Sequence, residues 1–238
     1  PIRALAAMLA SLHDSDGAVT VPGFMDGVTS PDPAILDAID AAGFDTAAYF
    51  AGIGAPVPDP QPSGHDLLVR QWLVPTLEFN GIFGGYSGPG TKTVIPSSAG
   101  AKITCRLVAG QEPGKVAKAI RHHLEAQLPT GYSLDVNRHG PGTKAFSIDP
   151  GLPALAVAET LLGEMMGAKS LRVAMGATIP IGSVFKEHLG VGTIFFSFST
   201  SDEDYHAPNE FFRLENLNIG KIAWVRLFQR LGLSMGGN

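Results

Sequence analysis

The sequence predicts an α+β sandwich in the first part of the chain and a piece of a parallel α/β sheet in the second. Over residues 2–137 the apolar periodicity runs helix, strand, strand, helix, strand. After the turn-forming residues 147–151 the pattern changes to alternating helices and strands. An apolar fraction of 45% with only 16% charged residues is typical of a well-buried globular chain.

The first part opens with a helix and continues into a long insertion. Apolar residues recur at helical spacing and the turn residues 14–17 end this helix, whose apolar stripe is Ile2, Leu5, Leu9 and Leu12. Residues 19–64 are rich in Pro, Gly and Asp, which predicts an insertion on the surface. One helix is expected within it at residues 33–42, with Asp32 as its cap and Pro33 in its first turn.

Two strands follow, at residues 74–82 and 101–108, and a glycine-rich loop joins them. In the second strand apolar and polar residues alternate, so that one face is apolar and Arg106 stands on the other. A helix can cover the apolar face with the stripe Val116, Ile120, Leu124 and Leu128. With a further strand at residues 132–137, this order describes most of a ferredoxin-like sandwich that lacks its first strand.

The second part reads as an incomplete parallel sheet. A helix over residues 152–165, a short strand at 171–175, a turn at 176–182 and a helix at 183–188 lead to a strand at 193–198. A final helix at about residues 213–231 is expected to turn five apolar side chains inward: Leu214, Leu217, Ile222, Val225 and Phe228. Both faces of the last strand are apolar or small, as in a sheet covered on both sides. We therefore expect the rest of this sheet to come from sequence outside the printed chain.

His206 follows this strand within an acidic turn, residues 202–210. A histidine among carboxylates at a strand-to-helix switch is typical of a metal or substrate site. A catalytic metal needs about three or four protein ligands, and no second such cluster occurs upstream. The sequence therefore predicts part of a metal site, with the other ligands elsewhere. Four other histidines have no partner at ligand spacing and are interpreted as surface residues: His13, His65, His139 and His188. His122 and His123 are adjacent on a helix and do not share a face, so one is expected to face solvent and the other to pack at the edge, and neither is expected to bind a metal.

The glycine-rich loop does not complete a catalytic motif. Thr91 separates Gly90 from Lys92, and no helix pattern follows, as a phosphate-binding loop requires. Residues 85–89 miss the serine-hydrolase elbow at their last position. We interpret it as a connecting loop.

Net charge, the length of apolar stretches and the cysteine content exclude further classes of function. A net charge of −5 and the lack of a Lys/Arg run argue against binding nucleic acid. No apolar stretch approaches the roughly 18 residues of a membrane span. Cys105 is the only cysteine, which favours a reducing, cytoplasmic location. The start at Pro1, without an initiator methionine or signal peptide, is interpreted as an internal cut in a longer polypeptide.

Four segments are distinctive as sequence motifs: Thr-Lys-Thr-Val-Ile-Pro at residues 91–96, Ile-Thr-Cys-Arg-Leu-Val at 103–108, Gly-Ala-Thr-Ile-Pro at 176–180, and Tyr-His-Ala-Pro-Asn-Glu at 205–210. Together they resemble the carnosinase-like dipeptidases of peptidase family M20, a family that also includes aminoacylases and glutamate carboxypeptidases. The resemblance covers essentially the whole chain in the same order.

The resemblance implies a homodimeric dipeptidase with two Zn²⁺ ions per site, or Mn²⁺ or Co²⁺ in their place. Residues 1–147 would be most of a ferredoxin-like lid that also dimerises, and residues 148–238 the C-terminal segment of the α/β catalytic domain. His206 would be a metal ligand and would border the peptide substrate. Thr93, Arg106 and Thr178 would bind the substrate, with Arg106 gripping its free carboxylate.

The family's remaining metal ligands and its general-base glutamate would precede the lid. No catalytic residue is therefore expected in this segment, and the chain alone is not expected to hydrolyse peptides. Two alternatives remain open: a non-catalytic dimerisation or binding module, which would hold no zinc, and the same fold acting on N-acyl amino acids or a diaminopimelate-type precursor. The insertion at residues 19–64 favours the dipeptidase.

Overall fold

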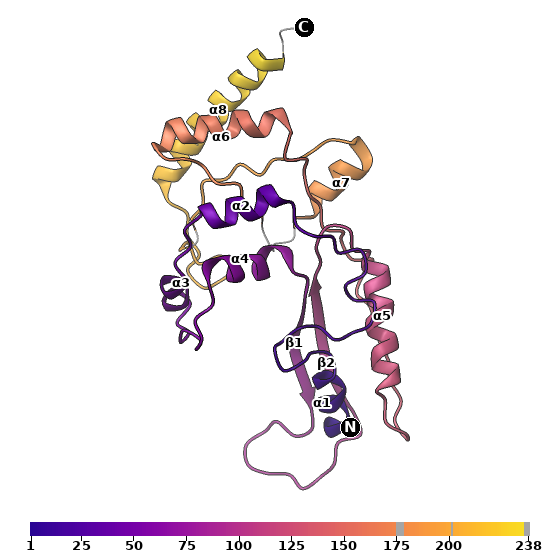
Figure 1. Cartoon of the computed structure of the whole chain (residues 1–238). Helices are drawn as coiled ribbons and strands as arrows, with labels where there is room; N and C mark the ends of the chain where they lie inside the picture. Colours follow the sequence, from indigo (N-terminus) through magenta and orange to yellow (C-terminus); the bar gives the residue numbers. More distant parts are fainter. Residues whose placement is uncertain (175–178, 201, 236–238) are drawn as a thin grey trace. The chain divides into compact units, whose positions relative to one another are not determined.

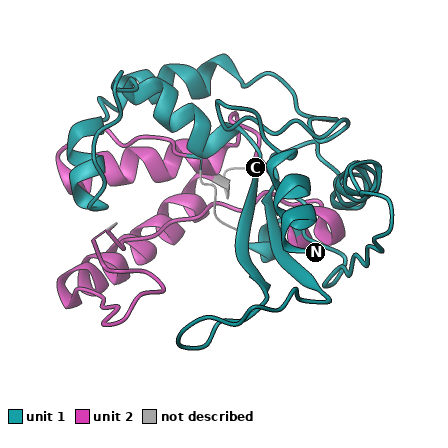
Figure 2. Ribbon diagram, turned by 90° about the horizontal axis from the view of Figure 1, so that it is seen from below, with its two compact units in different colours: residues 1–146, 174–183 teal, residues 147–173, 184–238 magenta. Residues whose placement is uncertain are grey.

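Residues 1–174, 179–200 and 202–235 are described by a computed structural model, in which the chain divides into two units. Unit 1 comprises Pro1–Phe146 with Ala174–Ser183, and unit 2 comprises Ser147–Val173 with Val184–Asn238 (Figure 2). Each unit is described by itself below.

A two-stranded antiparallel hairpin is the centre of unit 1 (Figure 1). Strand β1 (Thr76–Gly84) pairs with β2 (Ala99–Arg106) so that Leu77 lies opposite Cys105, with an irregularity between Phe79 and Gly81. Both strands were predicted within two residues of their ends. The alternation along β2 is confirmed, because its polar residues are exposed while Ile103 and Cys105 turn towards the core.

Two helices and the insertion bury the apolar face of this hairpin. Helix α1 (Ile2–Ala10) and helix α5 (Pro113–Ala126) lie on it, as the sequence predicted. The buried core of unit 1 consists of Met8, Leu9, Leu12, Val21, Phe24, Leu77, Val116 and Leu124. Phe24 comes from the insertion and is fully buried, so the insertion is part of the core as well as of the surface.

Residues 19–73, the insertion and the segment that leads to β1, contain more helix than the composition of the insertion indicated. Helix α2 (Pro33–Ala41) was predicted, and the Asp32 carboxylate caps it by accepting a hydrogen bond of 2.8 Å from the Ala34 amide. Helix α3 (Thr46–Gly52) and helix α4 (Gly64–Leu73) were not predicted. Asp45 and Ser63 cap them, and these caps before short apolar runs were the signal that the abundance of Pro and Gly obscured.

The predicted strand at residues 132–137 is wrong, because the structure has no strand there. Leu134 packs against the core of unit 1, as an inward strand residue would. The Val136 carbonyl, however, accepts a hydrogen bond from the Arg121 guanidinium of α5. A strand requires a neighbour with which to exchange backbone hydrogen bonds, and residues 132–137 pair with neither β1 nor β2.

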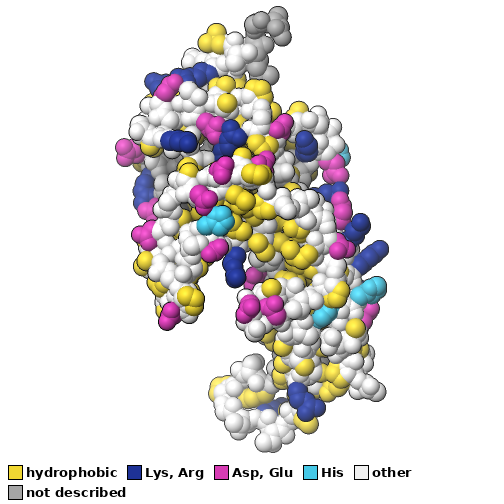
Figure 3. All heavy atoms as spheres, in the orientation of Figure 1, with side chains coloured by type: hydrophobic (Ala, Val, Ile, Leu, Met, Phe, Trp, Pro, Cys, Tyr) yellow, Lys and Arg dark blue, Asp and Glu magenta, His cyan; other side chains and the backbone are white. Residues whose placement is uncertain are grey.

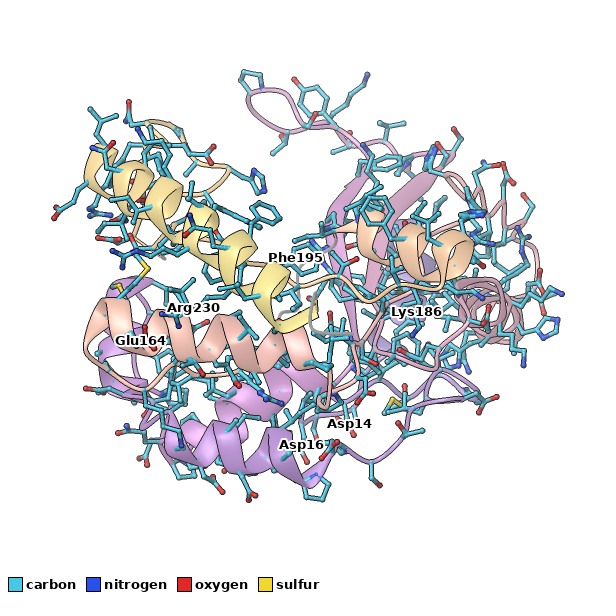
Figure 4. The ribbon with its side chains drawn as sticks, turned by 90° about the horizontal axis from the view of Figure 1, so that it is seen from above. Asp14, Asp16, Glu164, Lys186, Phe195 and Arg230 are labelled. Carbon is cyan, nitrogen blue, oxygen red and sulfur yellow. The ribbon has the colours of Figure 1, made fainter. Side chains whose placement is uncertain are left out.

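Unit 2 is built on two packed helices, α6 (Pro153–Met166) and α8 (Leu214–Met235). Its buried core is formed by Ala158, Leu161, Phe196, Ala223 and Leu227. Glu164 of α6 and Arg230 of α8 face each other and form an ion pair (Figure 4). The helix predicted at residues 183–188 corresponds to α7 (Pro180–Leu189), which begins three residues earlier than predicted.

The strands predicted in unit 2 are wrong for the described residues. Residues 171–174 and 193–198 have no ladder partner and form no strand. The predicted inward face of α8 is also wrong. The helix packs on α6 through Ala223 and Leu227, and the five residues expected inside are exposed by between 45% and 75%. Helix α8 thus has two apolar stripes. The structure buries the stripe that contains Ala223 and Leu227 and exposes the predicted one.

No helix among the described residues is long and apolar enough to cross a membrane. On the face drawn in Figure 3, Lys and Arg side chains are interspersed with Asp and Glu.

Candidate functional site

The loop that carries His206 joins the extended residues 193–200 to α8, and its backbone is unusual. Asp204, His206 and Asn209 have φ angles of 52°, 60° and 68°. Residues other than glycine rarely occupy this left-handed region, which costs free energy unless the surroundings enforce it. The Ala207 amide donates to the Asp204 carbonyl at 2.9 Å, and the Phe211 amide donates to the Glu203 carbonyl at 3.3 Å.

Arg213, at the start of α8, forms hydrogen bonds with side chains of this loop. Its guanidinium donates to both carboxylate oxygens of Asp202, at 3.0 and 2.6 Å. The Thr200 hydroxyl donates to Asp202 as well, at 2.6 Å. These hydrogen bonds, those from Arg213 first, lower the pKa of Asp202 to about 2. Asp202 is therefore a carboxylate already neutralised by a partner in its own loop.

Glu203 is the most buried acidic residue of this loop, with no exposed surface. Its carboxylate accepts hydrogen bonds from the backbone amides of Thr200 and Arg213, at 3.2 and 3.3 Å, and contacts the Arg213 guanidinium at 3.5 Å. A buried carboxylate is stable only when its oxygens are paired in this way. Glu203 thus ties the two ends of the loop together from the inside.

His206 is exposed on the outside of the same loop. Among the residues that the structure describes, its imidazole makes no hydrogen bond or ion pair. It can therefore offer a ring nitrogen to a metal or a substrate. No group of three or more His, Cys, Asp or Glu side chains within the described residues could hold a metal ion. The described donors of this chain do not by themselves fit a metal site.

Arg106 and Thr93 lie in unit 1, at different ends of the hairpin. Arg106 is the last residue of β2, opposite Thr76, on the exposed face of the strand. Thr93 is exposed in the loop of residues 85–98, where the Tyr86 hydroxyl donates to the Pro89 carbonyl at 2.9 Å and Lys92 lies 5.9 Å from the Tyr86 ring centre. The eight residues of β2 separate the two, each adding about 3.3 Å. The structure does not bring them together.

Thr178 lies outside the described residues. Of the four predicted site residues, two thus belong to unit 1, one to unit 2, and one is not described. Sequence reasoning missed Arg213 and Glu203 as the residues that shape the loop. The available signal was an arginine at the start of a helix that follows an acidic turn, but spacing alone does not show which carboxylate it contacts.

The sequence of this chain is similar to a known protein family and to several known proteins. The family described as "Peptidase dimerisation domain" of the M20 peptidases matches residues 1–131. The Beta-Ala-His dipeptidase of Mus musculus is 26% identical over 100% of this chain and 49% of its own length. The Cys-Gly metallodipeptidase dug1 of Schizosaccharomyces pombe is 28% identical over 96% of this chain and 47% of its own length.

Among solved structures, human carnosine dipeptidase 1 superposes with a TM-score of 0.79 at 27% identity, covering 96% of this chain and 48% of that chain. The chain therefore spans about half the length of the curated relatives that it matches.

Proposed function

The chain belongs to peptidase family M20, and from this membership we propose that it forms part of a metal-dependent peptidase that hydrolyses dipeptides or short peptides with a free C-terminal carboxylate. The similarity of almost the whole chain to two enzymes named as dipeptidases supports this substrate class. The single structural observation that carries the proposal is the His206 loop, in which the buried Glu203 and the Asp202–Arg213 ion pair hold the backbone while the imidazole of His206 is exposed.

We assign His206 the role of one ligand to a pair of zinc ions, with manganese or cobalt as alternatives. Because the donors of this chain do not complete such a site, the remaining ligands and the general base are assigned to another part of the complete protein. Asp202 and Glu203 are not assigned as ligands, since Arg213 and backbone amides already occupy their oxygens.

The substrate carboxylate is assigned to Arg106, whose planar guanidinium matches a carboxylate with two parallel hydrogen bonds. Its position at the exposed end of β2 supports this role. Thr93 and Thr178 are assigned to the rest of the substrate. Contact of both Thr93 and Arg106 with one dipeptide requires the loop of residues 85–98 to fold towards the end of β2.

The surface of unit 2 supports the presence of a further catalytic part. Two adjoining hollows on α8 share Phe196 and Trp224, and their lining is mostly apolar. Exposed apolar areas of this kind usually mark an interface. We propose that neighbouring strands of the catalytic domain cover these hollows. The dimerisation domain supports a homodimer through the lid, residues 1–147, and we propose a cytoplasmic location.

The test is metal content in the complete protein, measured by elemental analysis of wild type and His206→Ala. We expect His206→Ala to lose bound metal and dipeptidase activity. His188→Ala, an exposed histidine of the same unit, is the matched control and should change neither. Full metal occupancy in His206→Ala would remove this residue from the ligand set. A wild-type protein without metal would instead favour the non-catalytic module, and activity on N-acyl amino acids alone would favour the deacylase.

A further inference from the structure

Gln111 is a buried polar residue that the proposed chemistry does not use. It is 2% exposed, yet both ends of its amide are bonded. The Val108 amide donates to its side-chain oxygen at 2.9 Å, and its side-chain nitrogen donates to the Phe24 carbonyl at 2.6 Å. Gln111 thus connects the turn after β2 with the start of the insertion.

The turn itself consists of residues 108–111. The Gln111 amide donates to the Val108 carbonyl at 3.3 Å, and Gly110 has a φ of 92°. A positive φ at the third position of a turn calls for glycine. The Gln111 side chain returns to the Val108 amide, so the turn is closed by both backbone and side chain.

The insertion contacts this turn at a second point, between Gly27 and Gly110, where neither residue has a side chain. A Cβ atom built on Gly27 would lie 2.2 Å from the Gly110 carbonyl oxygen, and one built on Gly110 would lie 2.2 Å from the Gly27 carbonyl oxygen. No real side chain tolerates such a distance, so the two backbones touch where only glycine fits. Phe24, whose carbonyl makes the first of these contacts, has its side chain in the core with no exposed surface.

Arg106 lies two residues before Val108, at the point where β2 ends. Its backbone is held by Thr76 on one side, and the next fixed point along the chain is the closed turn. We propose that Gln111 is a positioning residue that holds the end of β2 against the insertion, so that Arg106 presents its guanidinium at a fixed place to the substrate carboxylate. This inference rests on the proposed function, because it assumes that Arg106 binds that carboxylate.

The test uses steady-state kinetics of the complete protein with a dipeptide and with the same dipeptide as a C-terminal amide. Gln111→Met keeps the volume and removes both hydrogen bonds. We expect its KM for the free dipeptide to rise about tenfold while kcat changes less than about twofold, because ground-state and transition-state binding of the carboxylate weaken together. The kinetics with the amide, which lacks the carboxylate, should not change.

Two comparisons separate positioning from general stability. Thr46→Val removes another buried hydrogen bond of unit 1, the one from Gln61, and should leave the KM unchanged. In an Arg106→Ala background, Gln111→Met should have no further effect on KM. If Gln111→Met does not fold, Gln111→Asn keeps the amide but shortens its reach to the Val108 amide and the Phe24 carbonyl, and it should produce the same selective rise.

The outcomes are distinguishable. An equal effect of Gln111→Met on the dipeptide and its amide, or a further effect in the Arg106→Ala background, overturns the positioning role. If Arg106→Ala itself leaves the KM of the free dipeptide unchanged, the assignment of Arg106 in the proposed function fails first, and the positioning role fails with it.

Discussion

Arg213 forms hydrogen bonds with two acidic residues of the His206 loop. These bonds determine which side chains of the loop remain available to bind a metal or a substrate. Asp202 and Glu203 would look like metal ligands beside a histidine, but their oxygens are used within the loop. Their contribution is to the backbone, which turns through three left-handed residues before α8 begins. At the residue scale, the proposed functional group is the exposed imidazole of His206, and the two carboxylates stabilise the backbone that carries it.

The pKa of Asp202 gives a pH-dependent prediction. Its folded pKa of about 2 lies below the roughly 3.9 of an unfolded aspartate. The stabilisation is therefore complete above about pH 4 and is lost as the pH falls towards 2. We expect Asp202→Asn to melt at a lower temperature than wild type at pH 7, and this difference to shrink between pH 4 and 2.

Thermal melting followed by circular dichroism measures this difference. Asp204→Asn, in the same loop but without a hydrogen bond from Arg213 among the described residues, is the control and should show no such trend. A difference for Asp202→Asn that stays constant from pH 7 to 2 would contradict the role of the Arg213 pair.

Cys105 gives a second residue-scale prediction. Burial, and then the nearby Glu78 carboxylate, raise the pKa of its thiol from 9.0 to about 11. Because the thiolate is the reactive form, a shift of two units lowers its population about 100-fold at pH 8. The folded protein should therefore react with a disulfide reagent about 100-fold more slowly than the unfolded protein. Rates within tenfold of each other would show that the side chain is not protected.

At the element scale, the packed pair of helices α6 and α8 forms the core of unit 2. Leu161 of α6 has no exposed surface and packs against the buried stripe of α8. Residues 171–174 and 193–198 form no strand. Unit 2 therefore depends on this helix pair for its stability.

We expect Leu161→Ala to destabilise unit 2 by about 2–5 kcal/mol, the usual cost of a Leu-to-Ala cavity in a core. Urea unfolding followed by the fluorescence of Trp224 measures it, with Trp72 replaced by Phe so that only unit 2 reports. Leu233→Ala, at a site that is 83% exposed, is the matched control and should change stability by less than about 0.5 kcal/mol. Equal effects of the two substitutions would contradict the observed packing.

The elements also show what the sequence could predict. The periodicity of α1, α5 and α6 was sufficient because a helix satisfies its own backbone. The strands at residues 132–137 and 193–198 were wrong because a strand depends on a neighbour that its own pattern does not encode. Helix α8 was placed correctly but faced wrongly, since two apolar stripes share it. His206 stood out by composition, whereas the role of Gln111 arises only when segments 87 positions apart in the chain meet, and the partners of Arg213 depend on how the loop folds.

At the scale of the whole molecule, unit 2 exposes large apolar side chains that a finished domain would bury. Phe195 is 49% and Phe228 is 65% exposed, and Phe228 lines one of the hollows on α8. The area is too apolar for an ordinary solvated surface. It supports the proposal that a further part of the protein covers this area.

We expect Phe228→Glu to leave the helix pair folded while reducing self-association and the binding of an apolar dye by the isolated chain. In the complete protein the same charge would be buried in the proposed interface and should abolish peptidase activity. Sedimentation, dye fluorescence and activity measure these effects. Leu233→Glu, outside the lining of the hollows, should leave activity intact. An active Phe228→Glu enzyme would show that nothing covers this surface.

The hydrogen bond between Gln111 and Phe24 joins residues 87 positions apart in the chain. Closing so large a ring of backbone costs entropy before any contact repays it, so this junction should form late when the protein folds. The segment between its two ends contains most of the insertion and the hairpin. It follows that the insertion cannot be excised or exchanged between relatives as a cassette unless the sequence at Phe24, Gly27 and the 108–111 turn is transplanted with it.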